Sequence, residues 1–316
     1  MKHLHKKILG IIVLLVLIAW LIHYGLSNYS SFKEVSFENP WLLIIIGIIF
    51  LLGYIPVSVI TYYLLAPFNV KLGKKESFGL SIVTGFYNLI MPFRGGMAVR
   101  GIYLKKKYGF SYTNFLATLA ASYILTFFIA SILGLFSVLN IYLTKNIISW
   151  PIFTIFSGMF LIFLIVIVLS PKIPETKYKF VNHFISTLNG WHLIKNKRNI
   201  LLAVIIMSVV QLLLSALNLL LQFKVFGIDI TLGSAIFLSA MGALSMIVGI
   251  TPAGLGINEA IIVFSASTLG ITPIQSLSAT LAGRFVGFIV LFILGPIFSY
   301  LLIKKGGSND KENSHK

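Results

Sequence analysis

Long apolar segments recur along the whole chain, and they restrict its fold more than any other feature. They lie at about residues 8–26, 41–66, 77–91, 94–104, 113–140, 150–170, 199–223, 233–251, 254–269 and 273–303. A helix needs about 20 apolar residues to cross the hydrocarbon of a bilayer, and six of these segments are long enough. Only 10% of the 316 residues are charged. The sequence therefore predicts an all-α polytopic membrane protein with about six full transmembrane helices.

The other four segments form two consecutive pairs, 77–104 and 233–269, each broken in its middle. The residues that break them are Pro92, Gly95 and Gly96 in the first pair, and Pro252, Gly254 and Gly256 in the second. Proline cannot continue a helix because it lacks an N–H group, and glycine permits a sharp reversal and a close approach of helices. We predict that each pair is a re-entrant hairpin. In the alternative, 233–251 and 254–269 are full spans and the protein has eight transmembrane helices.

The two broken pairs also resemble each other in sequence. Pro92 and Gly96 align with Pro252 and Gly256, and a Gly-x-Ser/Thr sequence opens the next helix 17 and 18 residues after the respective prolines. Three full spans separate the pairs, so one hairpin would open to the cytoplasm and the other outward. We therefore predict an inverted repeat, with halves at roughly 41–170 and 199–303, inside a single transmembrane domain at 1–303.

The formal net charge of +17 lies mostly in short loops. With both termini in the cytoplasm and both hairpins returning to their side of entry, 19 basic residues fall inside and three outside. This bias follows the positive-inside rule and predicts a multi-pass protein of the cell (plasma or inner) membrane with a disordered cytoplasmic tail at 304–316. No basic face on a soluble module is visible, which argues against nucleic acid as a partner. The absence of cysteine excludes disulfides and thiolate metal sites.

Four charged residues lie inside apolar segments: Arg94, Arg100, Glu259 and Arg284. An unpaired charge at the bilayer centre costs at least about 2.5–3.5 kcal/mol, so these side chains should pair with one another or line water. We interpret the arginines as receptors for a phosphate-bearing head group, gated by Glu259. The alternative is a Glu259–arginine ion pair that only holds the helices together.

Two asparagines accompany these charges, Asn88 in the first broken pair and Asn258 in the second. Their amides could bind a head group, or could join helices as polar contacts in membranes often do. No nucleophile elbow, phosphate-binding loop or metal-ligand spacing is present. The sequence thus predicts neither a metal nor a cofactor and does not support catalysis, although an enzyme using Glu259 as a base is an alternative.

The residues of both breaks resemble those of a known family. They are Pro92-x-Arg94-x-Gly96 with Arg100, then Thr251-Pro252-x-Gly254-x-Gly256-x-Asn258-Glu259 and the distal Arg284. Together they are similar to the transmembrane, flippase-like domain of lysylphosphatidylglycerol synthases, also called uncharacterised protein family 0104, over roughly residues 8–303. The chain has Asn258 where that family is expected often to have arginine. The resemblance implies a stand-alone translocation domain that lacks the soluble lysyltransferase domain of the two-part members.

The leading hypothesis is a lipid translocase for a phosphate-bearing lipid, either a phospholipid, aminoacylated or not, or a polyprenyl-linked lipid. A second hypothesis is a membrane subunit of a lipid-modifying system, such as phosphatidylglycerol lysyltransferase, which docks a separate enzyme on the basic loop 171–199. A third is a small-solute secondary transporter, because the same inverted architecture serves many substrates.

Overall fold

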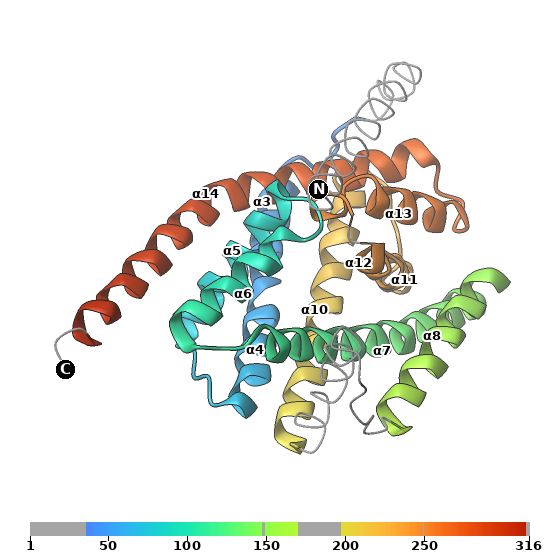
Figure 1. Ribbon diagram of the computed structural model, residues 1–316. Coiled ribbons are helices and arrows are strands. Elements are labelled where there is room, and N and C mark those ends of the chain that lie inside the picture. Colours follow the sequence, from blue (N-terminus) through green and yellow to red (C-terminus); the bar gives the residue numbers. More distant parts are fainter. Residues whose placement is uncertain (1–35, 147–148, 170–196, 249, 314–316) are drawn as a thin grey trace, which may run out of the picture.

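The computed structural model describes residues 36–146, 149–169, 197–248 and 250–313. The expected first span at 8–26 lies outside these residues, as does most of the basic loop 171–199. All regular structure in the described part of the chain is helical (Figure 1). The elements are α3 (Leu42–Leu52), α4 (Tyr54–Leu65), η1 (Ala66–Phe68), α5 (Lys74–Ile90), α6 (Gly95–Tyr108), α7 (Tyr112–Lys145), α8 (Trp150–Leu169), α10 (Arg198–Lys224), α11 (Leu232–Ala243), α12 (Ser245–Val248), η2 (Pro252–Gly254), α13 (Ile257–Ser267) and α14 (Pro273–Asn313).

Five helical stretches are long and apolar enough to cross a membrane, and they confirm five of the six long segments of the sequence. They are Leu42–Phe68, Tyr112–Thr144, Trp150–Leu169, Arg198–Lys224 and Pro273–Lys304. The first consists of α3 and α4, which are separated at Gly53, three residues before Pro56, whose ring crowds the preceding turn. Helix α14 continues to Asn313, whereas the apolar segment in the sequence ends at residue 303.

The first broken pair folds back on itself, as α5 and α6 pack against each other around a break at Met91–Arg94. Gly96 on α6 lies so close to α5 that an added Cβ would stand 1.9 Å from the carbonyl oxygen of Thr84. At the far end, the Glu76 carboxylate of α5 accepts hydrogen bonds from Tyr103, Lys107 and Tyr108 of α6, at 2.6, 2.9 and 2.7 Å. The start of α5 and the end of α6 therefore lie together, and we call this unit hairpin 1.

The second broken pair has the same form. Helices α11 and α13 pack against each other on either side of the break. Ile228 and Ile230, which precede α11, share one apolar cluster with Leu269 and Ile271, which follow α13. The two helices of this pair thus pack against each other within that cluster, and we call the unit hairpin 2.

The long helix α14 contacts both hairpins and shows their relative direction (Figure 1). Ala279 lies near the start of α14, which begins six residues after the end of α13 at the open end of hairpin 2, and it packs in one apolar cluster with residues of α11 and α13. Leu302, near its end, belongs to a cluster with Leu72 and Leu104 at the open end of hairpin 1. The 23 residues between Ala279 and Leu302 span about 35 Å of helix, close to the thickness of the hydrocarbon. The two hairpins therefore open toward opposite ends of α14.

The Glu76 cluster predicts that hairpin 1 is sensitive to acid. Burial alone would raise the pKa of Glu76, but the hydrogen bonds from Tyr103, Lys107 and Tyr108 and the charge of Lys107 hold it below the ordinary value of 4.5. A carboxylate with a lowered pKa stabilises the fold above its ordinary pKa, and that contribution is lost as the pH falls through the lowered value. The unfolding temperature should therefore fall as the pH drops below about 4.5 and through the lowered pKa of Glu76. Glu76→Gln should flatten this dependence in a thermal unfolding series, and an unchanged pH profile would contradict the assignment.

Candidate functional site

The breaks of the two hairpins meet in the interior of the protein. The backbone N–H of Phe93 in the first break donates a hydrogen bond to the carbonyl oxygen of Ile250 beside the second, at 3.2 Å. Both breaks also share one backbone form. The two residues after Pro92, Phe93 and Arg94, have φ near 54°, and the two after Pro252 have φ of 49° and 68°. Only at the next position do the breaks differ, because Gly95 already begins α6 whereas Leu255 is extended. The sequence alignment of the two prolines is thus matched by conformation.

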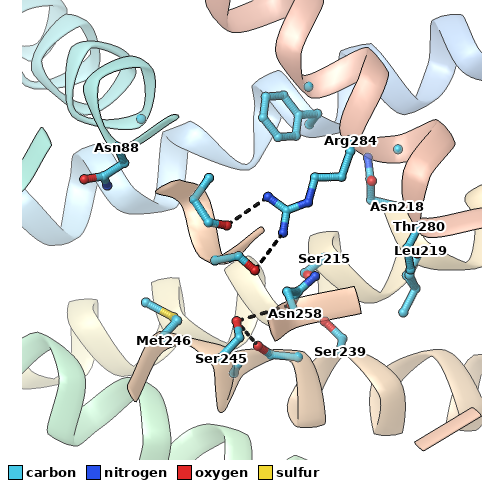
Figure 2. A pocket seen from close by; sticks show the side chains of 18 of the residues that line it. Asn88, Ser215, Asn218, Leu219, Ser239, Ser245, Met246, Asn258, Thr280 and Arg284 are labelled. Carbon is cyan, nitrogen blue, oxygen red and sulfur yellow. Dashed lines mark hydrogen bonds between the residues drawn. The ribbon is translucent and has the colours of Figure 1, made fainter. Parts of the chain in front are cut away.

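A cavity of about 530 Å³ lies against these breaks. Hairpin 1 contributes Asn88 and Arg94 to its wall, and hairpin 2 contributes Asn258. One face of α10 supplies polar side chains at helical spacing, namely Ser208, Gln211, Ser215, Asn218 and Gln222. We call this space the chamber. Arg284 of α14 also lines it (Figure 2). The chamber thus brings together four of the six residues predicted to bind a head group, namely Asn88, Arg94, Asn258 and Arg284.

Arg284 connects α14 to the break of hairpin 2. Its Nε donates to the Glu259 carboxylate, while Nη1 and Nη2 donate to the carbonyl oxygens of Ala253 and Gly254 at 2.8 and 3.3 Å. Figure 2 shows the Arg284 side chain with dashed hydrogen bonds at its guanidinium group. The other carboxylate oxygen of Glu259 accepts from the N–H of Gly256 at 2.6 Å, in the first turn of α13. Glu259 is 3% exposed and does not line the chamber, so its geometry is that of a counter-ion and helix cap behind Arg284.

Arg94 lines the chamber from the break of hairpin 1, immediately before α6 begins. It takes a left-handed conformation, with φ 54° and ψ 47°, which directs its side chain away from the helix that follows. Nη1 donates to the hydroxyl of Tyr123 on α7 at 2.5 Å, and the guanidinium carbon lies 5.3 Å from the ring centroid. Among the described residues Arg94 forms no ion pair within 4.0 Å. Its charge is therefore available to an anion in the chamber.

Arg100 lies apart from the other two arginines. It lines a second cavity, of about 400 Å³, which shares part of its wall with the chamber through residues such as Asn88, Met97 and Gln211. Arg100 is 8% exposed, and its Nη2 donates to Thr61 Oγ1 of α4 at 2.5 Å. The three arginines predicted to act together are thus divided between two adjoining cavities.

Unsatisfied polar atoms gather on these walls. Within the described part of the chain five buried side-chain atoms have no hydrogen-bond partner: Asn88 Oδ1, Arg100 Nε, Ser208 Oγ, Ser239 Oγ and Thr251 Oγ1. Every one of these residues lines the chamber or the second cavity. Buried polar groups are nearly always paired with protein or with water. The arrangement therefore fits cavities that hold water or a polar ligand.

The polar face of α10 is the main feature that sequence reasoning missed. Its five members recur at spacings of three, four, three and four residues along an otherwise apolar span, and this period places them on one side of a helix. Over 14 residues they extend about 21 Å. The same periodicity could have identified the helix that faces the cavity.

Comparisons with known proteins fit this arrangement. The family model described as "Lysylphosphatidylglycerol synthase TM region" matches residues 7–295. The chain belongs to this family. It is also 28% identical over 326 aligned positions to "UPF0104 membrane protein MJ1595" of Methanocaldococcus jannaschii, covering 95% of both chains. No solved structure matches the chain.

The family match covers both hairpins and all the residues of the two cavity walls. It confirms the resemblance read from the two Pro/Gly breaks, and with the five apolar spans it identifies a multi-pass membrane protein. The matched region includes Arg94, Arg100, Glu259 and Arg284. The site described above therefore lies wholly within the matched transmembrane region.

Proposed function

We propose that this protein is a lipid translocase, which moves a phosphate-bearing lipid between the two leaflets of the cell membrane with both of its termini in the cytoplasm. The observation that carries the proposal is the chamber at the meeting point of two oppositely directed hairpins. Interrupted backbone is tolerated at membrane depth only where protein or water shelters it. Two re-entrant hairpins with touching tips would provide such a shelter between the leaflets.

The chemistry of the wall favours an anionic head group. Arg94 and Arg284 both line the chamber, and guanidinium groups match phosphate oxygens in charge and geometry. Neutral amides and hydroxyls from α10 surround them and can bind glycerol or sugar hydroxyls. Among the residues that the structure describes, no carboxylate lines either cavity. A lysylated head group, which carries two ammonium groups, would find no counter-charge there, so an anionic lipid fits better than a cationic one.

Leaflet exchange in reconstituted vesicles tests the proposal. The protein should accelerate the exchange of fluorescent phosphatidylglycerol relative to protein-free vesicles, and should act less on lysylphosphatidylglycerol. Arg94→Gln should slow the exchange roughly ten- to hundredfold, because a hydrogen bond to a charged group contributes about 1.5–3 kcal/mol. Arg198→Gln is the matched control, since Arg198 is an exposed arginine at the start of α10.

The proposal fails if exchange stays at the protein-free rate for phosphatidylglycerol, lysylphosphatidylglycerol and a polyprenyl phosphate alike. Faster exchange of the lysylated lipid than of phosphatidylglycerol would leave translocation standing. It would, however, contradict the preference for an anion that the wall of the chamber suggests.

A further inference from the structure

The second cavity holds a buried cation with no counter-charge. Only two ion pairs form within 4.0 Å among the described residues, Lys107–Glu76 and Arg284–Glu259, and Arg100 belongs to neither. Its Nε has no hydrogen-bond partner in the part of the chain that the structure describes, and the hydroxyl of Thr61 is a neutral acceptor for Nη2. Burying a charge is costly unless it is paired and hydrogen-bonded. The geometry around Arg100 is therefore incomplete without an anion.

The surroundings of Arg100 show what kind of anion would fit. Tyr123 accepts a hydrogen bond from Arg94 through its hydroxyl oxygen, which leaves its own O–H proton to donate into the second cavity that it lines. Ser122, on the same helix, also lines this cavity. A guanidinium with two hydroxyl donors matches the several acceptor oxygens of a phosphate group. The rest of the wall mixes polar side chains such as Thr118 and Gln211 with aliphatic ones, and the aliphatic part can accommodate hydrocarbon. The aliphatic residues are Ile49, Val57, Ile60, Leu64, Leu65, Leu119 and Leu214.

From this geometry we infer that Arg100, Tyr123 and Ser122 form a phosphate-binding site in the second cavity, separate from the chamber. Its ligand is a phosphate group, carried either by a membrane lipid or by inorganic phosphate. The inference deepens the proposed function by giving the lipid a second binding site, between hairpin 1 and α7. It does not depend on translocation, since occupancy can be measured without leaflet exchange.

The cysteine-free chain offers a direct test with single cysteines. Ser122→Cys reports on the second cavity, and Ser239→Cys, which lines only the chamber, is the matched control. Each purified full-length variant is treated with two thiosulfonate reagents, one with a sulfonate and one with a trimethylammonium group. The positive electrostatic potential of Arg100 in the cavity should make the anionic reagent label Ser122→Cys about tenfold faster, or more, than the cationic one. Adding Arg100→Gln should abolish that preference there and leave the control unchanged.

Ligand protection then identifies the source of the phosphate. Phosphatidic acid, inorganic phosphate and uncharged diacylglycerol with the same chains are each added before labelling of Ser122→Cys. Protection by phosphatidic acid alone indicates a lipid phosphate, and protection by inorganic phosphate as well indicates that the free ion suffices. Equal protection by diacylglycerol would overturn the inference, because the cavity would then bind only the tails.

Two further outcomes would also overturn it. These are equal rates with both reagents, and no labelling of Ser122→Cys by either one. The comparison of the two reagents on Ser122→Cys keeps the native Arg100, so it remains valid even if the variant with Arg100→Gln does not fold. In that case Arg100→Lys, which keeps the positive charge, replaces Arg100→Gln as the second variant. Either negative result could coexist with leaflet exchange through the chamber, which separates this inference from the proposed function.

Discussion

Replacing Gly96 by alanine is expected to prevent hairpin 1 from closing. The added Cβ would stand 1.9 Å from the carbonyl oxygen of Thr84 and 2.7 Å from the backbone nitrogen of Asn88. Both are backbone atoms of α5, so no rotation of a side chain can relieve the overlap, and α5 and α6 must move apart. Overpacking usually costs about 1–3 kcal/mol and sometimes more, and a clash with backbone belongs at or above the upper end of that range.

The measurement is the thermal unfolding and the monodisperse yield of the purified protein in detergent. Gly158→Ala is the control, because its Cβ would meet nothing within 4 Å and its φ is not positive. It should keep the native unfolding temperature while Gly96→Ala loses most of the folded yield. Equal behaviour of the two variants would mean that α5 and α6 do not pack as closely as described, and the hairpin interpretation would be lost with it.

This close contact shows which parts of the structure the sequence could predict. Pro92, Pro252 and the glycines beside them mark the breaks because their effect on the backbone is local. The long apolar spans are equally local signals, and they gave the helix bounds within a few residues at most ends. The last helix extends beyond the apolar segment that predicts it, because residues 304–313 are polar and give no hydropathy signal.

The pairing of distant residues had no such local signal. Nothing in the sequence places Phe93 beside Ile250. Nor does the sequence indicate that Arg94 and Arg100, which are six positions apart in hairpin 1, line two different cavities. The left-handed conformation of Arg94 is also hard to predict, because a residue with a Cβ seldom adopts it. The separation of the arginines therefore follows from the packing of hairpin 1 against α4 and α7. This packing cannot be predicted when each segment of the sequence is considered by itself.

The second large effect is expected at the Glu259–Arg284 pair. One carboxylate oxygen of Glu259 accepts from Arg284 and the other from the N–H of Gly256. In Glu259→Gln one of those oxygens becomes an NH₂ group, which must face a donor. Because the position is buried, removing one partner of such a pair should cost about 3–5 kcal/mol. The break of hairpin 2 should loosen, since Arg284 also carries the bonds to Ala253 and Gly254.

A double-mutant cycle of unfolding free energies tests this coupling, with Glu259→Gln, Arg284→Met and the two combined. The double variant should lose clearly less stability than the sum of the single ones, with an interaction term of about 1–3 kcal/mol, because each single change leaves the other member of the pair without its partner, whereas the double variant removes both. Additive losses would show that the two side chains do not depend on each other. Arg284 would then be as free for a ligand as Arg94, and the counter-ion role of Glu259 would have to be given up.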